Sequence, residues 1–180
     1  MNDSAPPRLV PDYAFPPYSY VPGRFPHPIT DPKGHSYGVK PAPCEPPDPG
    51  RWRVCRTYLT GIDLFNHGYY WEAHEAWESL WHACGRKGTT ADFLKGLIKL
   101  AAAGVKMRQG EPRGVRNHAR RAVELFAKLC PAQRFMGLQI QQLISWAQKM
   151  AELPTETGEE GEQAVVVVCP FVLRPDEGDR

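Results

Sequence analysis

The residue types best suited to chemistry gather in one short stretch, WEAHEAWE, which begins at Trp71. If this stretch is helical, His74 and Glu78 lie one turn apart on the same face, and a pair at this spacing can bind one metal ion. Glu75 is then placed to act as a general base on a metal-bound water. The stretch therefore suggests a divalent-metal site in a hydrolase, with His74 and Glu78 as ligands and Glu75 as the base.

A metal in this place needs at least one more ligand from elsewhere in the chain. The segment PHPITDPKGHSYG supplies His27 and His35, and further formal candidates are Asp63, His67 and His118. The competing interpretation, which we favour, makes His74 and Glu78 ordinary boundary residues that pair with cations such as Lys95, Lys99 or Arg120. On that interpretation the protein needs no cofactor.

Three tryptophans, Trp71, Trp77 and Trp81, lie in the same predicted helix. They either belong to the hydrophobic core, which we favour, or line a groove for a peptide or small molecule. Such a groove would also include Glu72, Lys95 and Lys99. Glu72 is expected on the far side of the helix from the apolar stripe.

The composition argues against nucleic acid and membranes as partners. The chain has 180 residues and a formal net charge of +2, so it lacks the basic excess that polyanion binding needs. The basic run Arg113, Arg116, Arg120 and Arg121 is then more simply a solvated helix face. No apolar run approaches the roughly 20 residues of a membrane span, and the N-terminus lacks the pattern of a secretory signal. We therefore expect a cytoplasmic protein.

These residues must be positioned by helices, because apolar residues recur with helical spacing through the middle of the chain. The expected helices run from about Trp52 to His67, Tyr70 to Cys84, Thr89 to Gly110, Pro112 to Phe126 and Phe135 to Ala151. Short connections favour antiparallel neighbours. The sequence thus predicts an all-α domain over 51–152, a five-helix bundle of antiparallel hairpins.

Two segments flank this domain. Residues 1–50 carry 14 of the 19 prolines, which exclude a long helix, together with six aromatic residues that favour an arm docked on the core; a disordered tail is the alternative. Residues 153–180 form an acidic linker followed by a β-prone run, Val165–Leu173, that either packs on the bundle or pairs with another chain, so a homo-oligomer is possible. Five dispersed cysteines argue against a disulfide framework.

Three separated motifs also point to a known family. They are LFNHGYYWEAHEAWESLWHACG, FLKGLIKLAAAGVKMRQGEPRGVRNHARRAVELF and CPAQRFMGLQIQQL, and they fall in order over about residues 58–150. Together they resemble the domain of unknown function 309 family, in which an aromatic-glycine turn precedes a Glu-x-His-Glu-x-x-Glu helix. Lys95 and Lys99 stand where glutamine is expected in many members. The resemblance implies an all-α fold and supplies no mechanism.

The sequence thus leaves two functions open. We favour a non-enzymatic binding or scaffold module whose partner is a protein or a small molecule, since paired helices with an aromatic face suit that role. The alternative is the metal-dependent hydrolase built on His74, Glu75 and Glu78, with His27 or His35 supplied by the arm.

Overall fold

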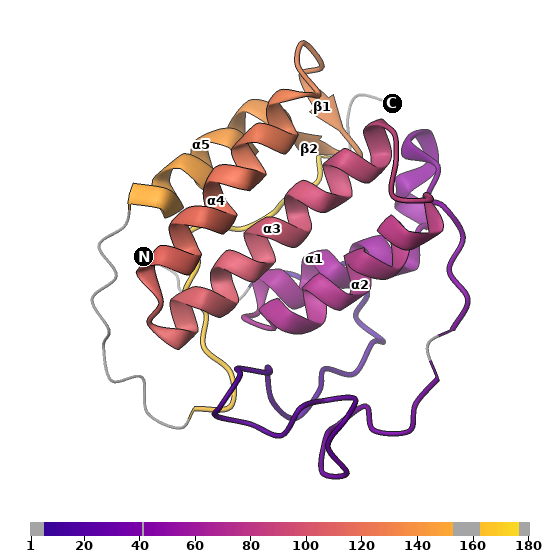
Figure 1. Ribbon diagram of the computed structural model, residues 1–180. Helices are drawn as coiled ribbons and strands as arrows, with labels where there is room; N and C mark the ends of the chain where they lie inside the picture. The colour runs from indigo at the N-terminus through magenta and orange to yellow at the C-terminus, as the bar shows by residue number, and fades with distance from the viewer. Residues whose placement is uncertain (1–5, 41, 153–162, 177–180) are drawn as a thin grey trace.

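The computed structural model describes residues 6–40, 42–152 and 163–176 and is mostly helical (Figure 1). The α-helices are α1 (Arg56–Asn66), α2 (Tyr70–Ala83), α3 (Thr89–Gln109), α4 (Pro112–Ala127) and α5 (Ile140–Glu152). A 3-10 helix, η1 (Pro49–Val54), precedes them, and β1 (Arg134–Phe135) pairs antiparallel with β2 (Leu138–Gln139). The predicted all-α class is therefore confirmed, with one small strand pair added.

Helices that are adjacent in sequence pack against each other, α1 on α2, α2 on α3, α3 on α4 and α4 on α5 (Figure 1). Close packing between them depends on glycine. A Cβ placed on Gly61 of α1 would lie 2.3 Å from Nε1 of Trp77 in α2. A Cβ on Gly104 of α3 would lie 2.7 Å from the ring of Tyr70. Because well-packed interiors do not tolerate added atoms, these glycines set how closely α2 approaches both neighbours.

Two predicted helices differ at their start. The segment expected as one helix from Trp52 divides at Cys55 (φ −80°, ψ 86°) into η1 and α1. The last helix begins at Ile140, because the residues before it form the β1–β2 hairpin. Its two-residue turn has positive φ at Met136 (46°) and Gly137 (81°), the geometry of a hairpin turn that matches strand twist.

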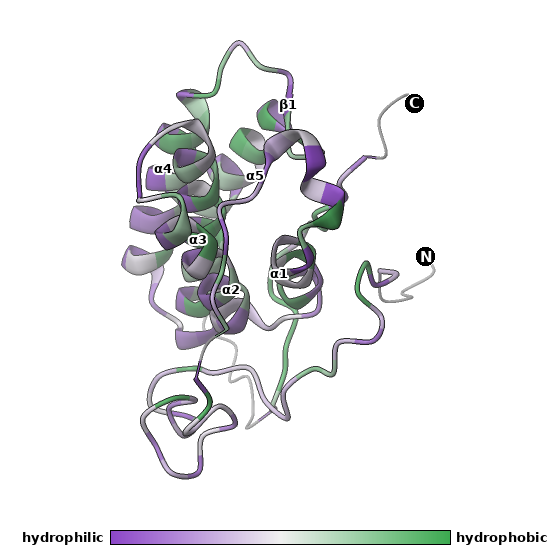
Figure 2. Cartoon of the chain, turned by 90° about the vertical axis from the view of Figure 1, so that its right-hand side faces the viewer, coloured by the Kyte–Doolittle hydropathy of each residue, from purple (hydrophilic) through white to green (hydrophobic). Residues whose placement is uncertain are grey.

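The arm and the tail both lie on the outside of the helices, the arm as the indigo-to-violet trace of Figure 1 and the tail as the yellow one. Figure 2 shows the same arm passing beside α1 and below α2. Val10 and Val21 of the arm are buried, as are Cys169 and Leu173 of the tail. Over 163–176 the β-prone tail forms no strand and runs as extended chain against the helices. The predicted acidic linker, 153–162, lies outside the described residues.

Candidate functional site

The three tryptophans of α2 lie in different environments. Trp77 is fully buried among core residues, while Trp71 and Trp81 are partly buried at its edge. Trp71 is covered by the arm, since its ring meets those of Tyr20 and His27 edge-on at centroid distances of 5.4 and 5.6 Å. The predicted groove of three tryptophans is therefore not a single open surface.

The three residues of the predicted metal site do come together on α2. One potential ligand atom from each of His74, Glu75 and Glu78 lies within 4.8 Å of the others, and all three side chains are partly exposed. The Nδ1 atom of His74 is 3.2 Å from Oε1 of Glu75 and 4.0 Å from Oε2 of Glu78. The described residues contain no other group of three such side chains.

A lysine already neutralises part of this group. The Lys95 ammonium of α3 lies 3.8 Å from Oε1 of Glu78 and 3.8 Å from the ring centroid of Trp81. A cation held between a carboxylate and an indole face opposes a second cation at the same carboxylate. The pairing of His74 and Glu78 with neighbouring charges, which we favoured from the sequence, therefore agrees with these distances.

Further basic groups extend this surface across α3 and α4. Partial burial lowers the pKa of Lys99, and the nearby positive charges of Lys95 and Arg121 lower it further. Burial likewise lowers the pKa of His118, with Lys99 as the next contribution. Desolvation and like charge both disfavour protonation, so this part of the surface resists any additional positive charge.

The arm histidines do not join the His74 group. His27 accepts hydrogen bonds at Nδ1 from the backbone N–H groups of Ile29 (3.2 Å) and Thr30 (3.3 Å). His35 has Nε2 3.1 Å from Oε1 of Glu72 and Nδ1 2.9 Å from Oγ of Ser36. In this structure neither His27 nor His35 belongs to the group formed by His74, Glu75 and Glu78, so a third ligand from the arm stays a prediction.

The other two histidines offered as formal ligands do not join the His74 group either. His67 places Nδ1 2.7 Å from the carbonyl oxygen of Asp63, and its ring packs 5.1 Å from that of Phe15. His118 is near enough to His74 for the two charges to interact, without belonging to the three-residue group.

The four arginines of α4 are exposed: Arg113, Arg116, Arg120 and Arg121.

A second group of polar side chains, which is buried, surrounds the turn between α1 and α2. Asp63 accepts hydrogen bonds from the backbone N–H groups of Leu9 and Val10, both at 2.8 Å, and its side chain is only 1% exposed. The Arg8 guanidinium lies 3.8 Å from the same carboxylate. Hydrogen bonds to a buried charged acceptor are among the strongest in proteins, so Asp63 is a firm attachment point for the arm.

Glu72 provides a second attachment point for the arm. Its Oε1 atom accepts a hydrogen bond from the backbone N–H of Tyr20 at 2.9 Å and contacts Nε2 of His35 at 3.1 Å. Among the described residues, its Oε2 atom is buried without a hydrogen-bond partner. Glu72 does lie away from the apolar stripe, but it is buried there, because the arm covers the side of α2 that we expected to face solvent.

The tail is held through its main chain as well. The Asn66 side chain donates to the carbonyl oxygen of Leu173 and accepts from its N–H, both at 2.8 Å. The Tyr70 hydroxyl accepts from the N–H groups of Val168 and Cys169, both at 2.9 Å. Burial raises the pKa of Tyr70 well above its ordinary value, so this hydroxyl stays protonated. Two neutral side chains thus hold the tail at two points.

The arm and the tail meet at Arg108 of α3. Its guanidinium donates to the carbonyl oxygens of Ser19 in the arm (3.4 Å) and Gln163 in the tail (2.9 Å). The N–H of Ser19 also donates to the carbonyl oxygen of Ala164 at 2.9 Å. Both segments therefore depend on one buried arginine where they come together.

We call Asp63, Asn66, Tyr70 and Glu72 the backbone-binding residues, since each pairs with main-chain groups of the arm or the tail. Sequence reasoning considered Asp63 only as a metal ligand and Glu72 only as a groove residue, and it missed Asn66 and the role of Tyr70. One signal was available. Asp63 and Asn66 are polar residues that directly flank the apolar pair Leu64 and Phe65 in α1, and buried polar groups require partners.

Comparison with known families agrees with the resemblance noted from the sequence. Residues 58–118 match the family model described as Domain of unknown function (DUF309). This range includes all four backbone-binding residues and the His74 group, and it excludes the arm and the tail. A search of the curated proteins found no match. Within the described residues, no helix is both long enough and apolar enough to span a membrane.

Proposed function

We propose that the DUF309-like part of this chain is a non-enzymatic binding module for extended polypeptide, with its own arm and tail as the segments bound in cis. One observation carries the proposal: four buried side chains around the α1–α2 turn pair with the main chain of two extended segments. Side chains that pair with main-chain groups recognise an extended conformation rather than a particular sequence.

Aromatic contacts add side-chain preference to this main-chain recognition. The ring of Phe15 packs 4.8 Å from that of Tyr69, and the ring of Tyr20 packs 5.4 Å from that of Trp71. An extended segment with two aromatic residues five positions apart, as Phe15 and Tyr20 are, would fit the same surface, because aromatic side chains supply most of the contact area in such interfaces.

The arrangement of the helices is compatible with this role. We interpret the five helices as a bundle of consecutive antiparallel hairpins, in which α1 and α2 form the hairpin that binds the segments. A partner protein would displace the arm or the tail, and a second copy of the chain could exchange one of them. The occupied site would then be a resting state that an incoming segment opens.

The proposal is tested by loosening the arm without changing the binding surface. Leu9→Pro removes the N–H that Asp63 accepts, while Leu9→Ala keeps it, and the Leu9 side chain is 42% exposed. A labelled peptide of residues 6–24 is titrated into full-length protein, with fluorescence anisotropy as the readout. The hydrogen bond to the charged Asp63 is worth about 1.5–3 kcal/mol, and its loss weakens the competing arm. The apparent Kd of the peptide should therefore be at least about tenfold lower for Leu9→Pro than for Leu9→Ala.

The control and the contrary outcome are both defined by the same titration. Wild type and Leu9→Ala should bind the peptide weakly and alike, since the arm still occupies the surface. If Leu9→Pro shows no saturable binding although hydrogen exchange shows its arm to be open, the binding function is contradicted.

A metal-dependent hydrolase is the second candidate, favoured by the convergence of His74, Glu75 and Glu78 within 4.8 Å. Elemental analysis of protein purified without a tag should then find stoichiometric zinc, manganese or iron, and His74→Ala should remove it. Lys95→Met would increase the metal content, because the competing ammonium is gone. Protein that is free of these metals after incubation with each ion contradicts this candidate.

A further inference from the structure

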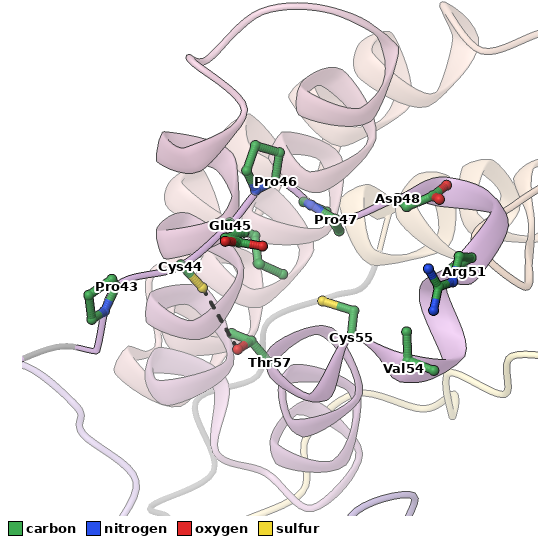
Figure 3. A pocket seen from close by; sticks show the side chains of 11 residues that line it. Pro43, Cys44, Glu45, Pro46, Pro47, Asp48, Arg51, Val54, Cys55 and Thr57 are labelled. Atoms are coloured by element: carbon green, nitrogen blue, oxygen red, sulfur yellow. Dashed lines mark hydrogen bonds between the residues drawn. The ribbon is translucent and has the colours of Figure 1, made fainter.

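A cavity of about 340 Å³ lies where the end of the arm meets η1, α1 and α2 (Figure 3). Arm residues 43–48 form one side of it, Arg51 and Val54 of η1 another, and Leu80 of α2 also contributes. The volume falls in the range of about 300–1,000 Å³ that is typical of small-molecule sites. This cavity is separate from the backbone-binding residues, none of which line it.

Two cysteines from different parts of the chain line this cavity. Cys44 belongs to the arm, and Cys55 is the N-cap of α1. Figure 3 shows the sulfur of Cys55 directed toward the side of the cavity on which Cys44 lies. The Cys44 sulfur lies 3.8 Å from Oγ1 of Thr57, which is two residues after Cys55 in the chain. Both residues are partly exposed and line the cavity.

The surroundings of the two sulfurs differ. The Sγ atom of Cys44 lies 3.5 Å from Oγ of Ser79 and 3.8 Å from Oγ1 of Thr57. Burial raises the pKa of the Cys55 thiol. Since the thiolate is the attacking species in disulfide exchange, Cys44 is the better first nucleophile.

The arm segment that carries Cys44 can also adjust its position. Among the described residues, 42–47 form no backbone–backbone hydrogen bond that a small displacement would break. A disulfide requires Cα atoms roughly 4.4–6.8 Å apart and a defined torsion angle. A segment without backbone pairing can reach that geometry while α1 stays in place.

We propose that Cys44 and Cys55 are a thiol pair that a low-molecular-weight disulfide, such as oxidised glutathione, converts to a disulfide bond between the arm and the start of α1. The Cys44 thiolate attacks the small disulfide, forms a mixed disulfide and releases one small thiolate. The Cys55 thiol loses its proton and attacks the Cys44 sulfur, which releases the second. In total the two protein thiols give up two protons and two electrons as the new S–S bond forms, and these reduce one small disulfide to two thiols.

The other three cysteines are less suited to this reaction. Cys169 is buried, and burial raises its pKa to about 12. Burial also raises the pKa of Cys84, which does not line the cavity. Cys130 is exposed and lies in the loop after α4, so it can form an adduct but lines neither side of this cavity.

Full-length protein, first reduced and then incubated with oxidised glutathione, tests the proposal by intact mass and peptide mapping. Wild type and the control Cys130→Ser should both yield a Cys44–Cys55 cross-link, and Cys130→Ser, which cannot form an adduct at residue 130, should show a net loss of two hydrogen atoms. Cys55→Ser should accumulate a stable glutathione adduct on Cys44. Cys44→Ser should form its adduct on Cys55 more slowly, because partial burial raises the pKa of the Cys55 thiol and so lowers its thiolate fraction.

Three outcomes would overturn the proposal. They are stable adducts on both cysteines of wild type without a cross-link, a cross-link that joins other cysteines, and equal adduct rates on Cys44 and Cys55 in the two serine variants. The assay needs no peptide ligand, so its result is independent of the binding function proposed above.

Discussion

Replacing Asp63 by asparagine tests how the arm is attached to the helices. Asp63 accepts from two backbone N–H groups, those of Leu9 and Val10, each at 2.8 Å. The asparagine amide keeps one acceptor oxygen and turns an NH₂ group toward the second N–H, so at least one hydrogen bond is lost. The side chain is buried, and water cannot easily replace the lost partner.

The size of the effect follows from that one bond. A hydrogen bond to a charged group contributes about 1.5–3 kcal/mol, which corresponds to about a 10- to 150-fold change in the opening equilibrium of the arm. Hydrogen–deuterium exchange of full-length Asp63→Asn should therefore show the amides of Leu9 and Val10 exchanging faster by about this factor. The amides in the middle of α3 should change little, since the helices keep their packing.

Asp12→Asn is the matched control, because Asp12 also joins the arm to α1 through its 2.7 Å pair with Arg56. Both side chains of that pair are more than half exposed, and exposed pairs contribute little to stability. The exchange of Leu9 and Val10 should thus respond far less to Asp12→Asn. Equal rates in the two variants, or no change in Asp63→Asn, would refute the reasoning.

Three further predictions concern packing, pH and the tail. Gly61→Ala should lower the free energy of unfolding by about 1–3 kcal/mol in urea denaturation, because the added Cβ meets Trp77. The control Gly114→Ala should cause no such loss, because its Cβ meets only the flexible side chain of Lys106. Equal losses in the two variants would contradict this prediction. The pKa of His118 lies below its ordinary value of 6.5, so stability should be lost as pH falls from above 6.5 through the folded pKa, and His118→Gln should flatten that slope; an unchanged slope would count against it. Asn66→Ala leaves main-chain groups of the tail unpaired at a cost of about 1–3 kcal/mol, so limited proteolysis should cut residues 163–176 faster than in wild type, and equal cleavage rates would argue against this contact.

The helices in the middle of the chain were predictable because their residues repeat with one period. The helix expected from about Tyr70 to Cys84 is observed as Tyr70–Ala83, and the one expected from Thr89 ends where Gly110 takes a positive φ of 68°. Local turns were less predictable. The β1–β2 hairpin depends on Met136 in a positive-φ conformation that methionine rarely adopts, so its sequence resembled the start of a helix.

The candidate site was only partly predictable, for a related reason. His74, Glu75 and Glu78 share one helix, and their closeness follows from helical spacing alone. The burial of Glu72 depends on an arm that begins more than 30 residues earlier and has no periodic structure, so spacing could not place His27, His35 or Tyr20. The pairing of Asn66 with Leu173 joins residues 107 positions apart, which only the folded chain reveals.

The most direct test of the central claim compares two peptides of residues 6–24 that differ only in main-chain methylation. N-methylation at Leu9, Val10 and Tyr20 removes the three N–H groups that Asp63 and Glu72 accept and leaves every side chain intact. Against full-length Leu9→Pro protein, we expect the unmodified peptide to bind saturably and the methylated one to bind at least about a hundredfold more weakly. Equal affinity of the two peptides would contradict recognition through the backbone.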